Sequence, residues 1–266
     1  MIVLEKTSLF VLDPNPAGNP AVLLIHGLGA DSESWILQFP GLIAVGTRPL
    51  AVDLPGFGKS KFPVNVDWTV PWVAAQVANW LRENANQTVI VVGLSMGGVI
   101  AQQLVLDYPE QFQGMVLAST FSRLRPRRWN ELMYLSARFA IANLRGVKSQ
   151  AYSVAWRVFP HPDQRDLREL LVQKIREADP RAYQSAMRNL AFFNARKRLR
   201  EVKVPTLVIS GAQDTTVSLE NQLDLLRDIP GAKYVLIESA NHAVNIDQPE
   251  AFDRVLLDFI NTCSKY

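Results

Sequence analysis

A serine between two glycines has the setting in this sequence that points most directly to chemistry. Gly93-Leu94-Ser95-Met96-Gly97 directly follows an apolar, β-branched run (TVIVV) and directly precedes a helical pattern. A strand-to-helix turn of this kind lifts the serine hydroxyl above the edge of a sheet, at the positive end of the helix dipole. We therefore predict that Ser95 is a nucleophile.

A serine hydroxyl needs a base to become a strong nucleophile, and the base needs an acid to orient it. His242, in the segment SANHAV between a predicted strand and the last helix, lies at the carboxyl edge of the predicted sheet. Asp214, in SGAQDTT, follows another strand and lies between Ser95 and His242 in the chain. The order Ser, Asp, His is typical of the strand–turn–helix class of nucleophile. We predict His242 as the general base and Asp214 as the acid.

The remaining histidines and the acids near Asp214 are predicted to have no catalytic role. His26 opens the loop HGLG and His161 lies in a helical region, and an isolated histidine is more often structural than catalytic. Asp224 and Asp228 fall within a predicted helix, where we expect them to face solvent.

A tetrahedral oxyanion is held by two backbone N–H groups that point to one place. Met96, directly after the nucleophile, is predicted to supply one of them. Leu28, in the loop that follows strand Ala21–Ile25, is predicted to supply the other, because ligands bind at the carboxyl edge of such sheets. Four further residues are predicted to line the substrate pocket: Phe121, Val217, Ala243 and Val244.

Short apolar runs alternate with helical patterns over most of the chain. The runs lack the alternation of a half-exposed strand, which indicates a parallel sheet covered on both faces. The alternation favours a doubly wound α/β fold with right-handed crossovers. The expected strands are Ala21–Ile25, Pro49–Val52, Thr88–Val92, Met115–Ala118, Pro205–Ile209 and Tyr234–Ile237, with helices at Pro71–Arg82, Val99–Tyr108, Leu219–Leu226 and Ala251–Ile260. A hairpin at Ile2–Leu12 is expected at the sheet edge.

One long segment, residues 121–200, interrupts this alternation and shows helical patterns only. We therefore predict a core domain of residues 1–120 and 201–266 with an inserted helical unit of residues 121–200. The insertion holds 18 Lys and Arg against 6 Asp and Glu, a net charge of +12, whereas the remainder holds 10 against 19, a net charge of −9. Such a split marks a structural unit or an interaction surface.

The basic residues gather at the two ends of the insertion and allow more than one interpretation. They could pair with the acidic core, or they could form a surface for nucleic acid or an anionic membrane. No nucleic-acid-binding motif accompanies them, so we expect no nucleic-acid partner. Arginines that face the entrance would attract anionic substrates. The two groups are Arg123, Arg125, Arg127 and Arg128, and Arg196, Lys197, Arg198 and Arg200.

Composition gives no indication of a membrane or an oxidising compartment. The opening residues MIVLEKTSLF carry an acid and a lysine where a secretory signal needs an unbroken apolar stretch. No run is long and apolar enough to span a bilayer. The single cysteine, Cys263, allows no internal disulfide. We expect a cytoplasmic protein without membrane insertion.

The segments HGLGA, DLPGFGKS, GLSMGG, SGAQDTT and SANHAV, in this order, resemble the α/β-hydrolase superfamily in the branch with a helical cap. The resemblance covers nearly the whole chain. It implies a doubly wound, mostly parallel eight-stranded sheet with an all-helical cap inserted over the pocket. It also implies hydrolysis through an acyl-enzyme on Ser95, without a cofactor or metal.

The expected reaction is hydrolysis of a small-molecule carboxylic ester, lactone or thioester. Carbon–carbon bond hydrolysis, or cofactor-free perhydrolase or haloperoxidase chemistry, on the same triad remains an alternative, and a non-catalytic ligand receptor is a third. The serine at the elbow argues against haloalkane dehalogenases and epoxide hydrolases, which have aspartate there. Ala243 stands where carbon–carbon bond hydrolases of the meta-cleavage type commonly have tryptophan, which makes that substrate class less favoured.

Overall fold

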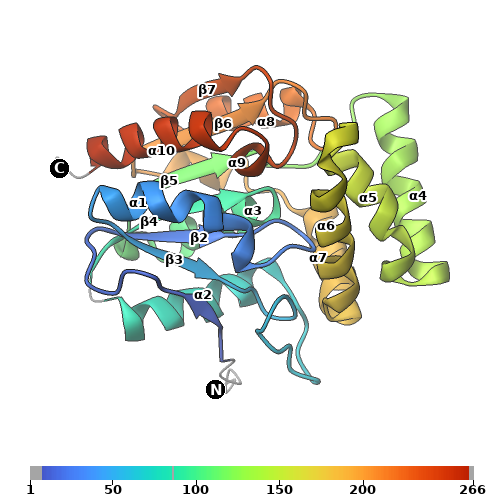
Figure 1. The fold of residues 1–266 in the computed structure, drawn as a ribbon, viewed down its shortest axis with the longest axis horizontal. Helices are drawn as coiled ribbons and strands as arrows, with labels where there is room; N and C mark the ends of the chain where they lie inside the picture. Colours follow the sequence, from blue (N-terminus) through green and yellow to red (C-terminus); the bar gives the residue numbers. More distant parts are fainter. Residues whose placement is uncertain (1–7, 86, 264–266) are drawn as a thin grey trace.

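The computed structural model describes residues 8–85 and 87–263, in which a central sheet lies between two sets of helices (Figure 1). The strands of this part of the chain have the order β1-β3-β2-β4-β5-β6-β7, and β1 alone runs antiparallel to its neighbour. They are β1 (Val11–Leu12), β2 (Ala21–Ile25), β3 (Arg48–Val52), β4 (Val89–Leu94), β5 (Phe112–Ala118), β6 (Thr206–Gly211) and β7 (Lys233–Ile237). The predicted doubly wound, mostly parallel fold is confirmed.

The strand count differs from the expected eight, because the described residues hold seven strands. The difference lies at the predicted hairpin Ile2–Leu12. Its first part falls on residues 1–7, outside the described residues, and its end is β1, which pairs with β3 at the sheet edge.

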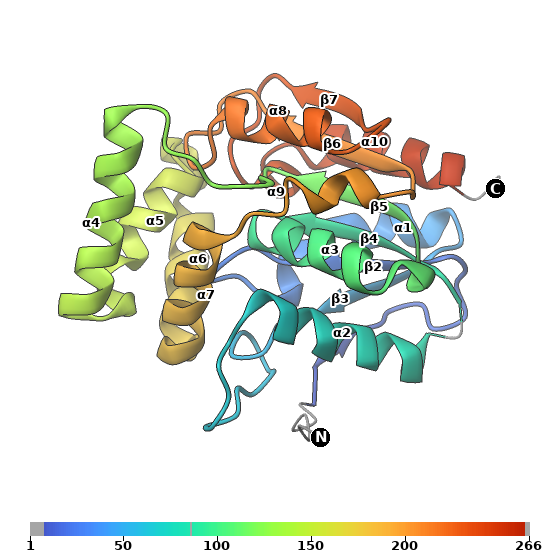
Figure 2. The same cartoon turned by 180° about the vertical axis from the view of Figure 1, so that it is seen from behind.

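The strands are buried on both faces because successive side chains of a strand point to opposite sides of the sheet. In β2, Leu23 and Ile25 belong to an apolar cluster that includes residues of α2 and α3. Val22 and Leu24 belong to a second cluster that includes residues of α1 and α10. Figure 2 shows α2 and α3 in front of the sheet. This double burial explains why the strands appear in the sequence as continuous apolar runs.

The helices of the described residues follow the strands in the expected alternation. Thr69 caps α2, with its side chain accepting a hydrogen bond from the Trp72 N–H at 3.2 Å. The core helices are α1 (Phe39–Ala44), α2 (Val70–Asn84), α3 (Met96–Asp107), α8 (Leu219–Asp228), α9 (Val244–Asp247) and α10 (Pro249–Cys263). A 3₁₀ helix, η1 (Ser32–Gln38), precedes α1.

Between β5 and β6 the chain forms helices that lie together beyond the carboxyl ends of the parallel strands (Figures 1 and 2). They are α4 (Trp129–Arg145), α5 (Ala151–Val158), α6 (Arg165–Glu177) and α7 (Pro180–Phe192), with short 3₁₀ turns η3 (Val147–Gln150), η4 (Pro162–Gln164) and η5 (Arg198–Glu201). We call residues 121–200 the cap segment. The N–H of Asp179, the N-cap of α7, donates to the Gly56 carbonyl at 2.8 Å and so joins this segment to the core. Its status as a separate domain stays a prediction.

Candidate active site

Ser95 lies in a sharp turn between β4 and α3. Its φ of 54° is a left-handed conformation that a residue with a side chain rarely adopts. The turn is tight because the backbone packs closely around it. A Cβ on Gly97 would overlap the Ile25 carbonyl, and a Cβ on Gly93 would overlap the Gly97 carbonyl. The two glycines of the motif are therefore required for the close packing that holds Ser95 at the sheet edge.

The structure brings the three predicted triad side chains together. His242 Nε2 lies 3.0 Å from Ser95 Oγ, and His242 Nδ1 lies 2.9 Å from Asp214 Oδ2. The side chains of His242 and Asp214 are 8% and 1% exposed, so this chain of contacts is shielded from water. The three side chains come from the loops that follow β4, β6 and β7, which lie at the same edge of the sheet. A base 3.0 Å from a hydroxyl is within reach of its proton.

Asp214 is held in place by further donors. Its Oδ1 accepts the backbone N–H groups of Thr216 at 2.7 Å and Val217 at 3.0 Å, and its Oδ2 accepts Gln222 Nε2 at 3.0 Å. Gln222, on α8, is fully buried and also donates to the Val217 carbonyl at 2.9 Å. Sequence reasoning missed Gln222. A polar residue on the buried face of an amphipathic helix close to the predicted acid is the signal that could have found it.

The two predicted oxyanion donors lie in segments close to the nucleophile, because a Cβ on Gly27, next to Leu28, would lie 3.7 Å from Ser95 Cβ. Met96 is the first residue of α3, and Leu28 lies in the loop after β2. Within the described residues, no hydrogen bond occupies the backbone N–H of Leu28 or Met96. The Leu28 side chain lines the cavity described next, whereas the Met96 side chain is buried in the core. Two N–H groups without acceptors beside Ser95 fit an oxyanion site.

Ser95 and His242 open into a cavity of about 360 Å³ between the sheet edge and the cap segment. Three of the four predicted pocket residues, Phe121, Val217 and Ala243, line it. Val244 does not, which corrects the prediction. It is fully buried in the apolar cluster that includes α1 and α10. As the first residue of the short helix α9 it packs against the core, and Ile246 lines the cavity instead.

Residues 20–249 match the family model for the alpha/beta hydrolase fold. The chain belongs to this family. The predicted superfamily is thereby confirmed, and with it the prediction that the chain is an enzyme. The match extends from β2 to the start of α10 and so includes all three residues of the predicted triad.

Named relatives of this α/β hydrolase share about a quarter of its residues over nearly its whole length. A pimeloyl-[acyl-carrier protein] methyl ester esterase from Aeromonas hydrophila is 27% identical, covering 91% of this chain and 95% of its own. A 3-oxoadipate enol-lactonase from Acinetobacter baylyi is 26% identical, with 90% and 88% covered. The crystal structure of an enol-lactonase from Burkholderia xenovorans superposes with a TM-score of 0.86 at 25% identity, covering 97% of this chain and 98% of that one.

Most of the side chains that line the cavity of this α/β hydrolase are apolar, but four charged residues also reach it. Lys174 Nζ lies 2.6 Å from both Asp31 Oδ2 and Glu33 Oε2. Burial acts to lower the pKa of Lys174, but the hydrogen bonds to the two carboxylates outweigh it and raise that pKa above its usual value. The fourth charged residue is Arg138, on α4.

His26 is a structural residue, as predicted. Its ring is fully buried, and its Nε2 lies 3.0 Å from the Leu54 N–H, so Nε2 accepts that proton. Nδ1 must then carry hydrogen, and it donates to the Gly27 carbonyl at 2.8 Å. The neutral ring therefore fixes the loop that carries Leu28. His161 lies on the surface, where its Nε2 is 3.1 Å from Asn241 Nδ2.

Burial lowers the pKa of His26 below its ordinary value of 6.5. The unfolded chain therefore binds a proton at this residue at a higher pH than the folded chain does. The stability from a neutral His26 is complete above 6.5 and is lost as the pH falls from 6.5 towards the lower folded pKa. As the pH is lowered through this range, we expect the urea midpoint of unfolding to fall less steeply for His26→Gln than for the wild type. Equal slopes would contradict this account.

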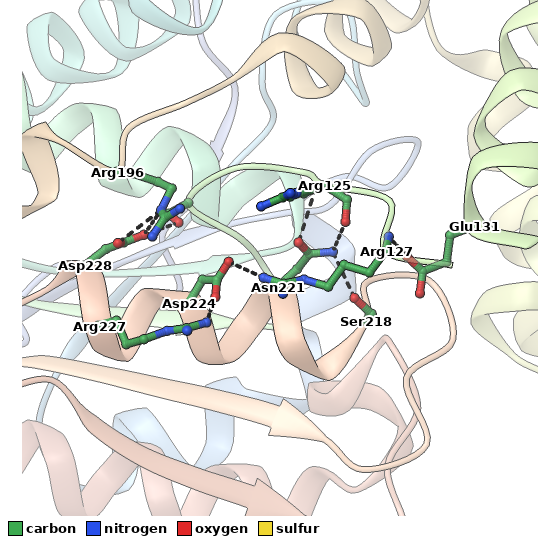
Figure 3. A network of polar contacts seen from close by, with 10 residues as sticks. Arg125, Arg127, Glu131, Arg196, Ser218, Asn221, Asp224, Arg227 and Asp228 are labelled. Atoms are coloured by element: carbon green, nitrogen blue, oxygen red, sulfur yellow. Dashed lines mark hydrogen bonds and ion pairs between the residues drawn. The ribbon is translucent and has the colours of Figure 1, made fainter. Parts of the chain in front are cut away.

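None of the arginines that follow β5 lines the cavity, and Arg127 among them pairs with a core acid, as does Arg196 near the end of the cap segment (Figure 3). Arg127 lies 2.6 Å from Asp224, and Arg196 lies 3.0 Å from Asp228. Asp228 also accepts the Ser122 hydroxyl at 2.6 Å. The two aspartates are 5% exposed, so the prediction that they face solvent is wrong. They are buried because the chain leaving β5 and the chain entering η5 both cross α8.

Two of the arginines expected to attract anionic substrates are therefore engaged elsewhere. Arg127 contacts Asp224, and Arg128 contacts Glu220 at 3.3 Å. The backbone of Arg125 is fixed by Asn221, whose side chain accepts its N–H at 3.3 Å and donates to its carbonyl at 3.0 Å. These contacts favour the interpretation that the basic residues join the cap segment to the acidic core.

The described part of the chain shows neither clustered metal ligands nor a membrane-spanning helix. Among residues 8–85 and 87–263, no group of three or more His, Cys, Asp or Glu side chains is arranged to hold a metal ion. No helix in these ranges combines the length and the apolar character that crossing a membrane requires.

Proposed function

We propose that this α/β hydrolase cleaves a carboxylic ester, or a closely related lactone or thioester, through an acyl-enzyme on Ser95. The observation that carries the proposal is the line of contacts from Asp214 through His242 to Ser95, at 2.9 and 3.0 Å, at the floor of an apolar cavity. The names of two relatives, a methyl ester esterase and an enol-lactonase, agree with this class of substrate.

In the first half-reaction Ser95 Oγ attacks the carbonyl carbon while His242 Nε2 takes the hydroxyl proton. His242 Nδ1 donates to Asp214, which holds the ring in the required tautomer and stabilises the imidazolium that forms. The carbonyl oxygen becomes an oxyanion and accepts the N–H groups of Leu28 and Met96. His242 then gives its proton to the alcohol oxygen, the carbon–oxygen bond breaks, and the acyl group remains on Ser95.

In the second half-reaction a water molecule replaces the alcohol. His242 takes one proton from the water, whose oxygen attacks the acyl carbon and again forms an oxyanion. Collapse of this intermediate returns the proton to Ser95 Oγ and releases the acid. The apolar walls excluding bulk water would strengthen each of these electrostatic contacts.

The experiment that tests the proposal combines a labelling reagent with a panel of substrates. A serine-directed phosphonate is expected to label Ser95 and no other residue, as read by peptide mass spectrometry. Rates are then measured for acyl-chain esters, lactones, thioesters and vinylogous diketones. Labelling at another residue would refute the nucleophile.

The panel also separates the alternatives. Cleavage of the diketones in preference to every ester would favour carbon–carbon bond hydrolysis. Peroxide-dependent turnover exceeding hydrolysis would favour perhydrolase chemistry. Binding without turnover of any member would favour a ligand receptor.

A further inference from the structure

Arg138 is a cation on the wall of an apolar cavity, and within the described residues no carboxylate pairs with it. Its Nε donates to Gln150 Oε1 at 3.1 Å, and one terminal nitrogen lies 3.3 Å from the Tyr183 hydroxyl. Both partners are neutral. The charge of Arg138 is therefore uncompensated in the described part of the chain, while part of its hydrogen-bonding capacity is still free.

The neutral partners also fix the position of the guanidinium group. Gln150 and Tyr183 are 1% and 0% exposed, and they lie on η3 and α7, two different elements of the cap segment. Burial raises the pKa of Tyr183, which keeps its phenol neutral. Tyr134 lies one turn before Arg138 on α4, with its ring centroid 5.8 Å from the guanidinium carbon. A rigid guanidinium of this kind is suited to bind a carboxylate.

The other charges of the cavity are already matched. Asp31 and Glu33 both contact Lys174 at 2.6 Å, so the carboxylates that line the cavity are engaged by a cation of their own. Arg138 is half-buried. A partly desolvated cation without a counter-ion carries a cost, and binding an anion reduces it. The cavity thus offers one place, at Arg138, where an anion gains a partner without displacing another.

Arg138 and Ser95 reach the cavity from different parts of the fold. Ser95 is at the sheet edge, whereas α4 is the cap helix that lies farthest from the sheet (Figures 1 and 2). Apolar lining residues from the core and from the cap segment lie along the cavity, among them Leu37 and Ile246 of the core and Leu135 of the cap segment. A ligand that fills the cavity would therefore be apolar along its length and anionic at one end.

We propose that Arg138 binds a carboxylate at the end of the substrate remote from the scissile ester. The preferred substrate class is then the monoester of an α,ω-dicarboxylic acid, with an apolar chain between the two carboxyl groups. This inference rests on the proposed function, because the ester end is placed at Ser95.

The test compares matched substrates and variants. Monomethyl esters of α,ω-dicarboxylic acids are paired with methyl esters of simple fatty acids of equal chain length. The ratio of kcat/KM for the acidic ester to that for the neutral ester should fall about 10- to 100-fold in Arg138→Gln, the effect of losing a charge-assisted contact. Arg145→Gln, an exposed residue on the same helix that does not line the cavity, should leave the ratio unchanged.

A charge reversal separates recognition from damage to the fold. Arg138→Glu should favour a methyl ester that carries a terminal ammonium group over the acidic ester, which a merely structural role of Arg138 would not produce. An unchanged acidic-to-neutral ratio in Arg138→Gln would overturn the inference and leave the proposed function intact.

The inference can also be tested without turnover. Calorimetric binding of the acidic ester to Ser95→Ala should weaken by a similar factor when Arg138→Gln is added. If Arg138→Gln weakens binding but the wild type hydrolyses no ester, the anion site stands and the proposed function is refuted. Equal affinity with and without the arginine would overturn the anion site.

Discussion

Alanine at position 95 should lower kcat for every ester that this α/β hydrolase cleaves by about three orders of magnitude or more. The change removes the attacking oxygen and leaves His242 and Asp214 in place. It also keeps the backbone unchanged, because alanine retains the Cβ that serine already holds at a φ of 54°. Stopped-flow or steady-state hydrolysis, together with circular dichroism and thermal unfolding, gives the measurement.

Ser119 provides a matched control for this variant. It is a buried serine at the end of the neighbouring strand β5, it also has a positive φ, of 47°, and it does not line the cavity. Ser119→Ala should therefore keep near-normal kcat. Activity of Ser95→Ala close to that of Ser119→Ala would rule out Ser95 as the nucleophile.

The core of the fold was predictable because its strands are unusually uniform. A strand buried on both faces has no polar side, so β2 and β4 appear as the unbroken runs AVLLI and VIVV. The turn at Ser95 could be recognised for a related reason. The close packing around it tolerates no Cβ at Gly93 or Gly97, so the sequence keeps a visible pattern there.

The parts that sequence reasoning missed depend on contacts between distant segments. From the sequence, Asp228 has the pattern of an exposed acid on a helix. In the structure it contacts Ser122 and Arg196, which lie far away in the chain. Val244 follows the triad histidine closely, yet the short helix α9 turns its side chain into the core. The helical turns between Ser32 and Ala44 carry too few residues to show a clear period.

The uneven charge along the sequence also acquires a structural explanation. Cations of the cap segment meet acids of the core at several places, including Arg127 with Asp224, Arg198 with Asp107 at 2.9 Å, and Lys174 with Asp31. An exposed pair such as Arg198 with Asp107 contributes only about 0–1 kcal/mol. The distribution of these pairs still favours one orientation of the cap segment relative to the core. Among the described residues it leaves Arg138 as a cavity cation without an acid partner.

Asparagine at position 214 should lower kcat by about four orders of magnitude, the size of effect that the same change has in serine proteases. The reason lies in the donors around Asp214. Its Oδ1 faces two backbone N–H groups, from Thr216 and Val217, and its Oδ2 faces His242 and Gln222. The amide nitrogen of the introduced asparagine is itself a donor, so at either position it would face other hydrogen-bond donors.

Backbone donors cannot change, whereas a histidine can exchange tautomers. We therefore expect the amide nitrogen of the introduced asparagine to replace Oδ2 and to donate to His242 Nδ1. Hydrogen then resides on Nε2, which faces Ser95 Oγ at 3.0 Å and can no longer take its proton. The introduced amide nitrogen then faces the donor Gln222 Nε2. Gln222 cannot relieve this clash of donors by rotating its amide, because its Nε2 also donates to the Val217 carbonyl. A loss of stability of about 1–3 kcal/mol should accompany the loss of activity.

Asp247→Asn is the matched control, because Asp247 lies in the same region without touching His242. Its Oδ2 accepts the Asn241 N–H at 2.6 Å and the Asn241 side chain at 2.8 Å. That variant could shift the loop that carries His242, but it leaves the tautomer of the ring unchanged, so its kcat should fall far less. Measured kcat values on one neutral ester, with urea unfolding for each variant, distinguish the two acids. An active Asp214→Asn beside an inactive Asp247→Asn would mean that Asp247, rather than Asp214, orients the histidine.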